Sequence, residues 1–164
     1  MKYRYVLTIA VLFLILPMTS GVAQEIDQMS VIRNAIYRVQ YDDKTQEKAK
    51  FTNGVFTKDD LANDLKYFFE IAQKPMLVTD LGVAYVVMWT SKGGSGGWAT
   101  IKVIDLKTNP PDEIKSFPQI AEDRIQIESL LLNGKHLILK VLRHGPEDAL
   151  CCPTQKGIIK YSLQ

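Results

Sequence analysis

The 164-residue sequence is poor in the residues that most often carry chemistry. It contains two cysteines and two histidines, and the cysteines, Cys151 and Cys152, are neighbours. No pair of histidines has zinc-binding spacing, and no serine lies in a nucleophile elbow. The sequence therefore predicts neither an assembled catalytic centre nor a metal or cofactor.

Long hydrophobic runs are also scarce. The longest, Val6–Leu16, is too short to span a membrane as a helix. Lys2 and Arg4 precede this run and small residues follow it, which is the pattern of a secretory signal peptide. We expect residues 1–23 to be removed after Ala23, leaving a periplasmic or secreted protein without a stable membrane anchor.

An excess of charge of one sign is missing as well. The whole chain has 20 basic and 18 acidic residues, and the predicted signal peptide holds two of the basic ones. The remaining chain therefore has a formal charge of zero. Since nucleic-acid binding requires a basic surface, the composition argues against a nucleic-acid partner.

The rest of the chain, 24–164, has the length of one ordinary domain. Alternating apolar and polar residues predict a strand at 36–41, and Val83–Trp89, apolar on both faces, predicts a central strand. Asn53-Gly54 and Asn133-Gly134 are strong hairpin signals. We expect a mainly β fold (α+β possible): a single antiparallel domain built from β-hairpins, with one or two short helices.

Other segments are less clearly patterned. Thr57 and Asp60 resemble a capping box, which predicts a short helix around 58–66. Lys66–Ala72 fits either a helix or a strand, and Pro75 should interrupt it. Residues 24–30 are polar and expected to be loosely held, while 107–118 reads as a proline-punctuated loop.

The glycine-rich segment Lys92–Gly97 separates two strand-like runs. Phosphate-binding glycine loops lead from a strand into a helix, so a flexible hairpin tip is the favoured interpretation here. Trp89 and Trp98 flank the tip, and we expect a cross-strand aromatic pair rather than a sugar platform. His136, at the start of a strand, is expected at the surface.

The acidic residues form four dispersed neighbouring pairs. Their spacing selects no general acid/base pair, and solvated turns explain all of them. The pairs are Asp59-Asp60, Asp112-Glu113, Glu122-Asp123 and Glu147-Asp148.

The adjacent cysteines are the most unusual local feature. In an exported protein they meet an oxidising compartment, and the chain offers no other cysteine to pair with. A bond between neighbours must be strained, because their α-carbons are only about 3.8 Å apart. We favour a vicinal Cys151-Cys152 disulfide. The alternatives are two free or buried thiols packed in the loop, intermolecular disulfides, and metal ligation by the two cysteines with His144.

The segment around the cysteines resembles the C-terminal signature of a group of uncharacterised, exported bacterial proteins. The matching residues are "LRHGPEDALCCPTQKGIIKYSL", "DRIQIESLLLNGKHLILKVLRHGP" and "MWTSKGGSGGWATIKVI". The resemblance covers about the last 90 residues and implies an exported β-rich domain, with no activity to transfer. A weaker similarity extends to the mycobacterial LppP/LprE-type lipoproteins.

The sequence departs from that group in two places. Members carry a run of oxygen ligands, Gly-Asp-Leu-Asn-Gly-Asp-Gly, before the central strand, whereas only Asp80 stands there in this chain. The resemblance therefore does not imply calcium binding. Ala149-Leu150 replaces the proline that usually precedes the cysteine pair.

These observations favour a non-enzymatic binding or interaction domain of the cell envelope, with an envelope or extracellular partner of unknown identity. The expected functional surface is the loop with His144, Gly145, Pro146, the two cysteines and Pro153. One alternative is a thiol-dependent enzyme or redox protein that uses the cysteine pair, with His144 as base. Another is a secreted protein inhibitor that inserts a rigid loop into another protein.

Overall fold

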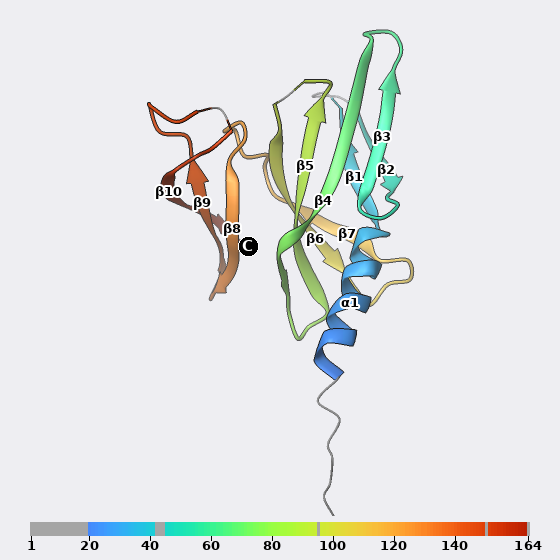
Figure 1. Cartoon of the computed structure of the whole chain (residues 1–164). Helices are drawn as coiled ribbons and strands as arrows, with labels where there is room; N and C mark the ends of the chain where they lie inside the picture. The colour runs from blue at the N-terminus through green and yellow to red at the C-terminus, as the bar shows by residue number, and fades with distance from the viewer. Residues whose placement is uncertain (1–19, 42–44, 95, 150, 164) are drawn as a thin grey trace, which may run out of the picture.

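A computed structural model describes residues 20–41, 45–94, 96–149 and 151–163 of the chain (Figure 1). Most of the predicted signal peptide, residues 1–19, lies outside them. The elements in the described part are α1 (Ser20–Arg33), β1 (Ile36–Gln40), β2 (Gln46–Lys50), β3 (Val55–Asp60), β4 (Leu65–Val78), β5 (Val83–Lys92), β6 (Trp98–Asp105), β7 (Asp112–Ser116), β8 (Gln126–Asn133), β9 (His136–Arg143) and β10 (Gln155–Ser162). In that part of the chain, α1 does not have the length and apolar character needed to cross a membrane.

The strands form two sheets. The large sheet has the order β2-β1-β7-β6-β5-β4-β3, and the small sheet has the order β10-β9-β8. Neighbouring strands are antiparallel except β1 and β7, which run parallel and pair only at Ile36 and Asp112. The predicted mainly β, hairpin-rich fold is therefore confirmed.

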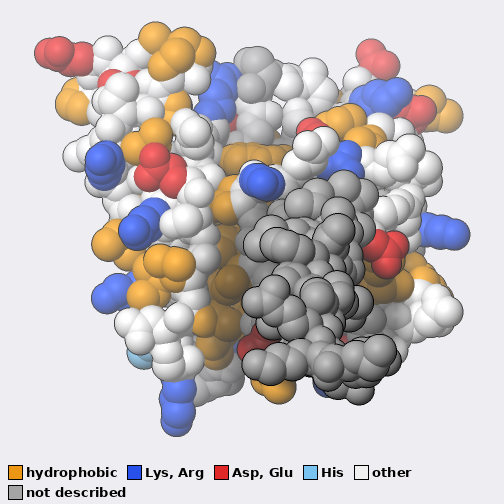
Figure 2. Space-filling view, turned by 60° about the horizontal axis from the view of Figure 1, so that its bottom comes forward, with side chains coloured by type: hydrophobic (Ala, Val, Ile, Leu, Met, Phe, Trp, Pro, Cys, Tyr) orange, Lys and Arg blue, Asp and Glu red, His pale blue; other side chains and the backbone are white. Residues whose placement is uncertain are grey.

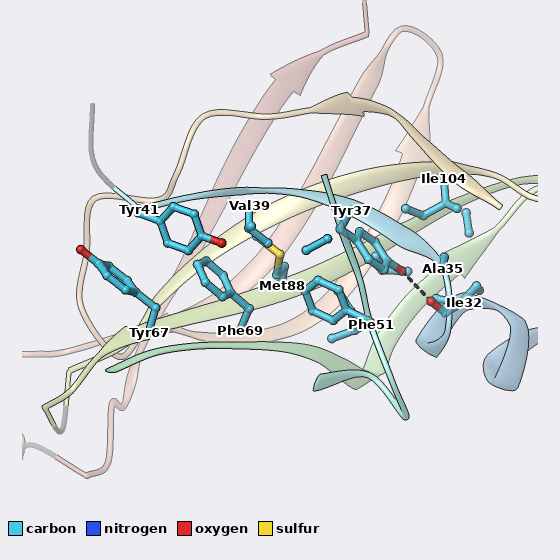
Figure 3. Packing of buried hydrophobic residues seen from close by; sticks show 14 residues of the cluster. Ile32, Ala35, Tyr37, Val39, Tyr41, Phe51, Tyr67, Phe69, Met88 and Ile104 are labelled. Carbon is cyan, nitrogen blue, oxygen red and sulfur yellow. Dashed lines mark hydrogen bonds between the residues drawn. The ribbon is translucent and has the colours of Figure 1, made fainter. Parts of the chain in front are cut away.

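The large sheet curls until its two edge strands meet. Lys58 Nζ on β3 lies 2.8 Å from Glu47 Oε2 on β2. The inside of the curl holds the first hydrophobic core, in which Tyr37 lies edge to face against Phe51, and Tyr41 against Tyr67 and Phe69 (Figure 3). Its fully buried aromatic members are Tyr37, Phe51 and Phe69.

The C-terminal end of α1 closes one end of this core. Ile32 is fully buried, and its carbonyl oxygen accepts a hydrogen bond of 2.8 Å from the Tyr37 hydroxyl (Figure 3). Burial, followed by the charge of Glu113, raises the pKa of Tyr37 well above its ordinary value. The phenol is therefore held neutral, as a buried hydrogen-bond donor should be.

The second core lies between the two sheets. Strands β5 and β6 contribute one face, and β8 and β9 contribute the facing side chains. Its buried members include Val87, Ile101, Ile127, Leu137 and Leu139. Since the other face of β5 enters the first core through Val86 and Met88, the prediction that Val83–Trp89 is a central strand covered on both sides is confirmed.

The predicted helix at 58–66 is wrong. Strand β3 runs to Asp60, and β4 begins at Leu65 and continues through Lys66–Ala72. Asp60 does cap, since its Oδ1 accepts the Ala62 and Asn63 N–H groups at 3.1 and 3.3 Å. Asp60 caps a turn and not a helix, because the residues of β4 that follow the turn pair with both β3 and β5 and are therefore extended.

Strand β4 also passes through Pro75. Its pairing with β5 is irregular between Ile71 and Met76, so Pro75 lies where the ladder is already broken. A proline has no N–H to donate and is tolerated in a sheet at such a bulge. The expected interruption is thus a local irregularity within one long strand.

Three further expectations are corrected by the structure. Residues 24–30 belong to helix α1, and the expected loop 107–118 contains strand β7. Trp89 pairs with Ala99 and Trp98 with Thr90, and residues directly opposite each other share a face of the sheet. Because adjacent residues point to opposite faces, Trp89 and Trp98 lie on opposite faces and form no cross-strand pair.

Candidate functional site

The expected functional loop connects β9 to β10 at one end of the small sheet (Figure 1). Pro146, Cys151 and Cys152 are exposed, whereas His144, Gly145 and Pro153 are half-buried. We call residues 144–154 the β9–β10 loop; Leu150 lies outside the described residues. The candidate residues therefore lie together in one largely exposed segment.

Asp148 organises this loop. Its Oδ2 accepts the backbone N–H groups of Gly145 at 2.8 Å and Thr154 at 2.7 Å, and its Oδ1 accepts the Thr154 hydroxyl at 2.8 Å. The bond from Gly145, then those from Thr154, lower the pKa of the Asp148 carboxyl. Asp148 is therefore a carboxylate clasp that ties both ends of the loop together, a role that the expectation of a solvated turn acid did not include.

The two cysteines lie inside the segment that Asp148 clasps. Their sulfur atoms are 2.33 Å apart, a disulfide distance, and their α-carbons are 3.8 Å apart. The Cys152 N–H donates to the Ala149 carbonyl at 3.0 Å, which closes a tight turn that ends at Cys152. The vicinal pairing expected from the sequence is thus present, and both cysteines face solvent.

His144 is half-buried. Its Nε2 atom is buried and has no hydrogen-bond partner among the described residues. In the described part of the chain, no cluster of three or more His, Cys, Asp and Glu side chains could hold a metal ion. Within the described residues of the loop, the chemically distinctive feature is therefore the cysteine pair.

A second cluster of chemical groups was missed by the sequence reasoning. Glu113 and Lys102 are buried side by side, with side chains 0% and 4% exposed, and Lys102 Nζ lies 3.3 Å from Glu113 Oε2. Arg38 adds a third charge, with Nε 3.5 Å from Glu113 Oε1. The expectation that Glu113 occupies a solvated turn is therefore wrong.

This buried cluster replaces missing sheet hydrogen bonds. Beyond Ile36, strands β1 and β7 no longer pair, so the backbone groups of Arg38 need other partners. Glu113 Oε2 accepts the Arg38 N–H at 2.8 Å, and Lys102 Nζ donates to the Arg38 carbonyl at 2.7 Å. Burial lowers the pKa of Lys102, while Glu113 opposes that shift.

A pocket of about 290 Å³ opens beside Lys102. It is lined by Gln40, Gln46, Met88, Thr90, Thr100, Lys102, Ser116, Phe117, Pro118 and Gln119. The ammonium group already bonds the Arg38 carbonyl and Glu113. The cluster therefore bridges β1 and β7 where the two strands separate. The charges of Lys102 and Glu113 contact protein groups and each other.

The Lys102 cluster had one sequence signal. Lys102 interrupts the apolar run Ala99–Ile104, and such a lysine on a strand covered on both faces must be buried. A buried lysine requires an anionic partner. The sequence could thus have predicted a pair, although it could not have selected Glu113 from the other carboxylates.

The glycine-rich tip and the acidic pair that follows β7 are tied together. The Gly97 N–H donates to Asp123 Oδ1 at 2.7 Å, and the Arg124 N–H donates to the Gly97 carbonyl at 2.9 Å. Asp123 therefore anchors one end of the tip, which the sequence predicted to be flexible. His136 lies exposed at the start of β9, as expected.

Comparison of the chain with protein-family models, curated proteins and solved structures finds no match.

Proposed function

We propose that this protein is an exported, non-enzymatic binding domain of the cell envelope, and that the β9–β10 loop is part of its binding surface. One observation carries the proposal: the Asp148 carboxylate clasps Gly145 and Thr154 while the enclosed cysteines face solvent. A loop held in one shape loses little conformational entropy when a partner binds it. Such a loop suits recognition better than it suits a moving lid.

Export is the second part of the proposal. It rests on the N-terminal pattern of Lys2, Arg4 and the Val6–Leu16 run, and on the resemblance of the Cys-Cys-Pro-Thr segment to exported proteins. The cysteine pairing agrees with export, since disulfides persist in oxidising compartments. The partner would accordingly be another envelope or extracellular molecule.

The thiol-enzyme alternative has less support. A nucleophilic cysteine acts as a thiolate, and in this structure each sulfur lies at a disulfide distance from the other. A secreted inhibitor would use the same rigid loop, so it is one form of the proposed binding function. Identification of the partner separates an inhibitor from other binding domains.

Site-specific photo-crosslinking in exporting cells tests the proposal. A photoreactive phenylalanine analogue replaces Glu147, an exposed residue of the β9–β10 loop. The matched control places it at Leu61, which is 92% exposed on the β3–β4 turn of the other sheet. We expect a light-dependent adduct of one defined mass from position 147 and none from position 61.

A loop variant completes this test. Asp148→Asn replaces one acceptor oxygen with an amide donor and should reduce the adduct at position 147. If position 147 gives no adduct, or both positions crosslink the same set of proteins, the loop is not a binding surface.

A further inference from the structure

Within the described residues, one edge of the small sheet has no neighbouring strand. Among the four sheet edges of the described residues, β2 and β3 meet through Glu47 and Lys58, and β8 lies beside β4. Strand β10, at the end of the order β10-β9-β8, pairs on one side only. Along Gln155–Tyr161, the outer side of β10 therefore presents main-chain donors and acceptors that another strand could satisfy.

The outer face of β9 and β10 combines lysines with apolar side chains. Lys156, Ile158 and Lys160 alternate with inward-facing Gly157 and Ile159 on β10. Ile158 is 60% exposed. Basic and hydrophobic side chains lie side by side over the part of the molecule that holds the small sheet, at the left of Figure 2.

A hollow of about 290 Å³ lies on the same face. It is lined by Glu128, Lys140, Val141, Lys156, Gly157 and Ile158. Lys140 is directly opposite Ile158 in the β9–β10 register, so lysine stems and Ile158 wall the hollow. Among the described lining residues Glu128 is the one carboxylate, and the face thus has an apolar hollow between positive charges.

We propose that β10 receives an added strand from a partner protein, and that this strand carries an apolar residue flanked at alternate positions by Asp or Glu. The strand would continue the β10-β9-β8 sheet through main-chain hydrogen bonds. Its acidic side chains would lie opposite Lys156 and Lys160, and its apolar side chain would cover Ile158 and the hollow. This inference rests on the proposed function, because it names the chemistry of the partner.

Charge argues against a second copy as the occupant. An antiparallel pair of β10 strands centred on Ile158 would place Lys156 of one copy opposite Lys160 of the other. Like charges directly opposite each other destabilise a strand pair. The lysines that discourage self-pairing therefore favour an acidic strand. Anionic lipid headgroups could pair with the lysines, but a lipid surface has no regularly spaced donors and acceptors for the main-chain groups at the edge of β10.

A pair of peptides tests the proposal on the purified full chain. The first, the valine-glutamate peptide, is the capped ten-residue sequence Thr-Glu-Thr-Val-Thr-Glu-Thr-Val-Thr-Glu, which places glutamate and valine in turn on one face of a strand. The second has the same sequence with N-methylated amides at alternate residues, which removes the donors that would face the β10 edge. Binding is followed by NMR shifts of the β10 amides at low ionic strength. We expect shifts with the first peptide and a loss of binding with the second.

Matched charge variants accompany the peptides. Lys156→Glu with Lys160→Glu should weaken binding of the valine-glutamate peptide at least tenfold and allow a valine-lysine peptide to bind. Lys50→Glu with Lys92→Glu makes the same change of charge at exposed positions of the large sheet and should leave the affinity within twofold.

Several outcomes would overturn the proposal. Failure of the valine-glutamate peptide to bind would do so, and so would equal binding of the N-methylated peptide. Tighter binding of phosphatidylglycerol vesicles than of the peptide would assign the face to lipid, and β10-dependent dimers would assign it to a second copy. Because Asp148→Asn lies outside β10, retained peptide binding in that variant separates failure of the loop proposal from failure of this one.

Discussion

At the scale of single residues, the buried charges lie where strands β1 and β7 of the large sheet stop pairing. Lys102 and Glu113 supply the partners that the Arg38 backbone lacks where β1 and β7 separate. The loss of one member of an ion pair in a protein interior is strongly destabilising, because it leaves the other charge buried without a partner. Their role is therefore best tested by removing one charge and then both.

Replacement of Lys102 by methionine should lower the free energy of unfolding by about 3 kcal/mol or more, because it leaves Glu113 buried and the Arg38 carbonyl unpaired. The double variant Lys102→Met with Glu113→Leu should lose less than the sum of the two single losses. Urea unfolding measures both effects. Lys140→Met, at an exposed position of β9, is the control and should change stability by no more than about 0.5 kcal/mol. Equal effects of Lys102→Met and Lys140→Met would refute the account.

Asp148 gives a prediction about pH. Its carboxyl has a lowered pKa in the folded protein, so its clasp stabilises the loop above the unfolded-state pKa of about 3.9. That stabilisation is lost as the pH falls through the lowered folded-state pKa. The amide proton shifts of Gly145 and Thr154 should titrate together below that ordinary value, and the titration should vanish in Asp148→Asn. Independent titration of the two amides would contradict the clasp.

At the scale of elements, the two Asn-Gly turns were predicted from the sequence but do different things. Gly54 and Gly134 both have positive φ angles, of 81° and 57°. A Cβ on Gly54 would lie 2.5 Å from Arg33 Cζ, whereas a Cβ on Gly134 would meet nothing within 4 Å. Arg33, at the end of α1, also donates to the Ile71 carbonyl at 2.8 Å. The first turn is thus a joint between helix and sheet.

This difference predicts unequal effects of alanine. Gly134→Ala should cost about 1 kcal/mol, the conformational cost of a left-handed alanine. Gly54→Ala should cost more, since it adds a clash with Arg33 to the same backbone cost. Thermal or urea unfolding of the two variants gives the comparison. Equal losses would mean that Arg33 moves aside freely and does not join α1 to the turn.

Local patterns predicted the elements that depend on neighbouring residues in the chain. Apolar runs separated by Asn133-Gly134 gave the β8–β9 hairpin, and the two-faced apolar run gave the central strand β5. Elements fixed by distant contacts were missed or left undecided between helix and strand. Strand β7 pairs with β6 and touches β1 at Ile36, and β4 is extended because β3 and β5 flank it. No local signal encodes these pairings.

The candidate site was predictable in part for the same reason. The adjacent cysteines and the surrounding His-Gly-Pro and Pro-Thr residues are visible in the sequence, and the structure keeps them in one loop. The clasp was not predictable, because Asp148 looked like the other dispersed acids until Gly145 and Thr154 were brought to it. The Lys102–Glu113 pair likewise needed the sheet order to bring its members together.

At the scale of the whole molecule, the two sheets have different structural roles. The large sheet curls around its own aromatic core, and the small sheet covers the outer face of β5 and β6. The small sheet also carries both proposed contact regions, the β9–β10 loop and the β10 edge. We therefore expect variants of exposed small-sheet residues to affect binding while leaving the unfolding free energy nearly unchanged.

We propose that export delivers a protein whose exposed cysteines are bonded to each other. The most direct test is the intact mass of the protein recovered from the exporting cell, alkylated with and without prior reduction. The account predicts a chain lacking residues 1–23 that takes up no alkyl group before reduction and two afterwards. A chain that retains those residues, or one that takes up two groups without reduction, would contradict it.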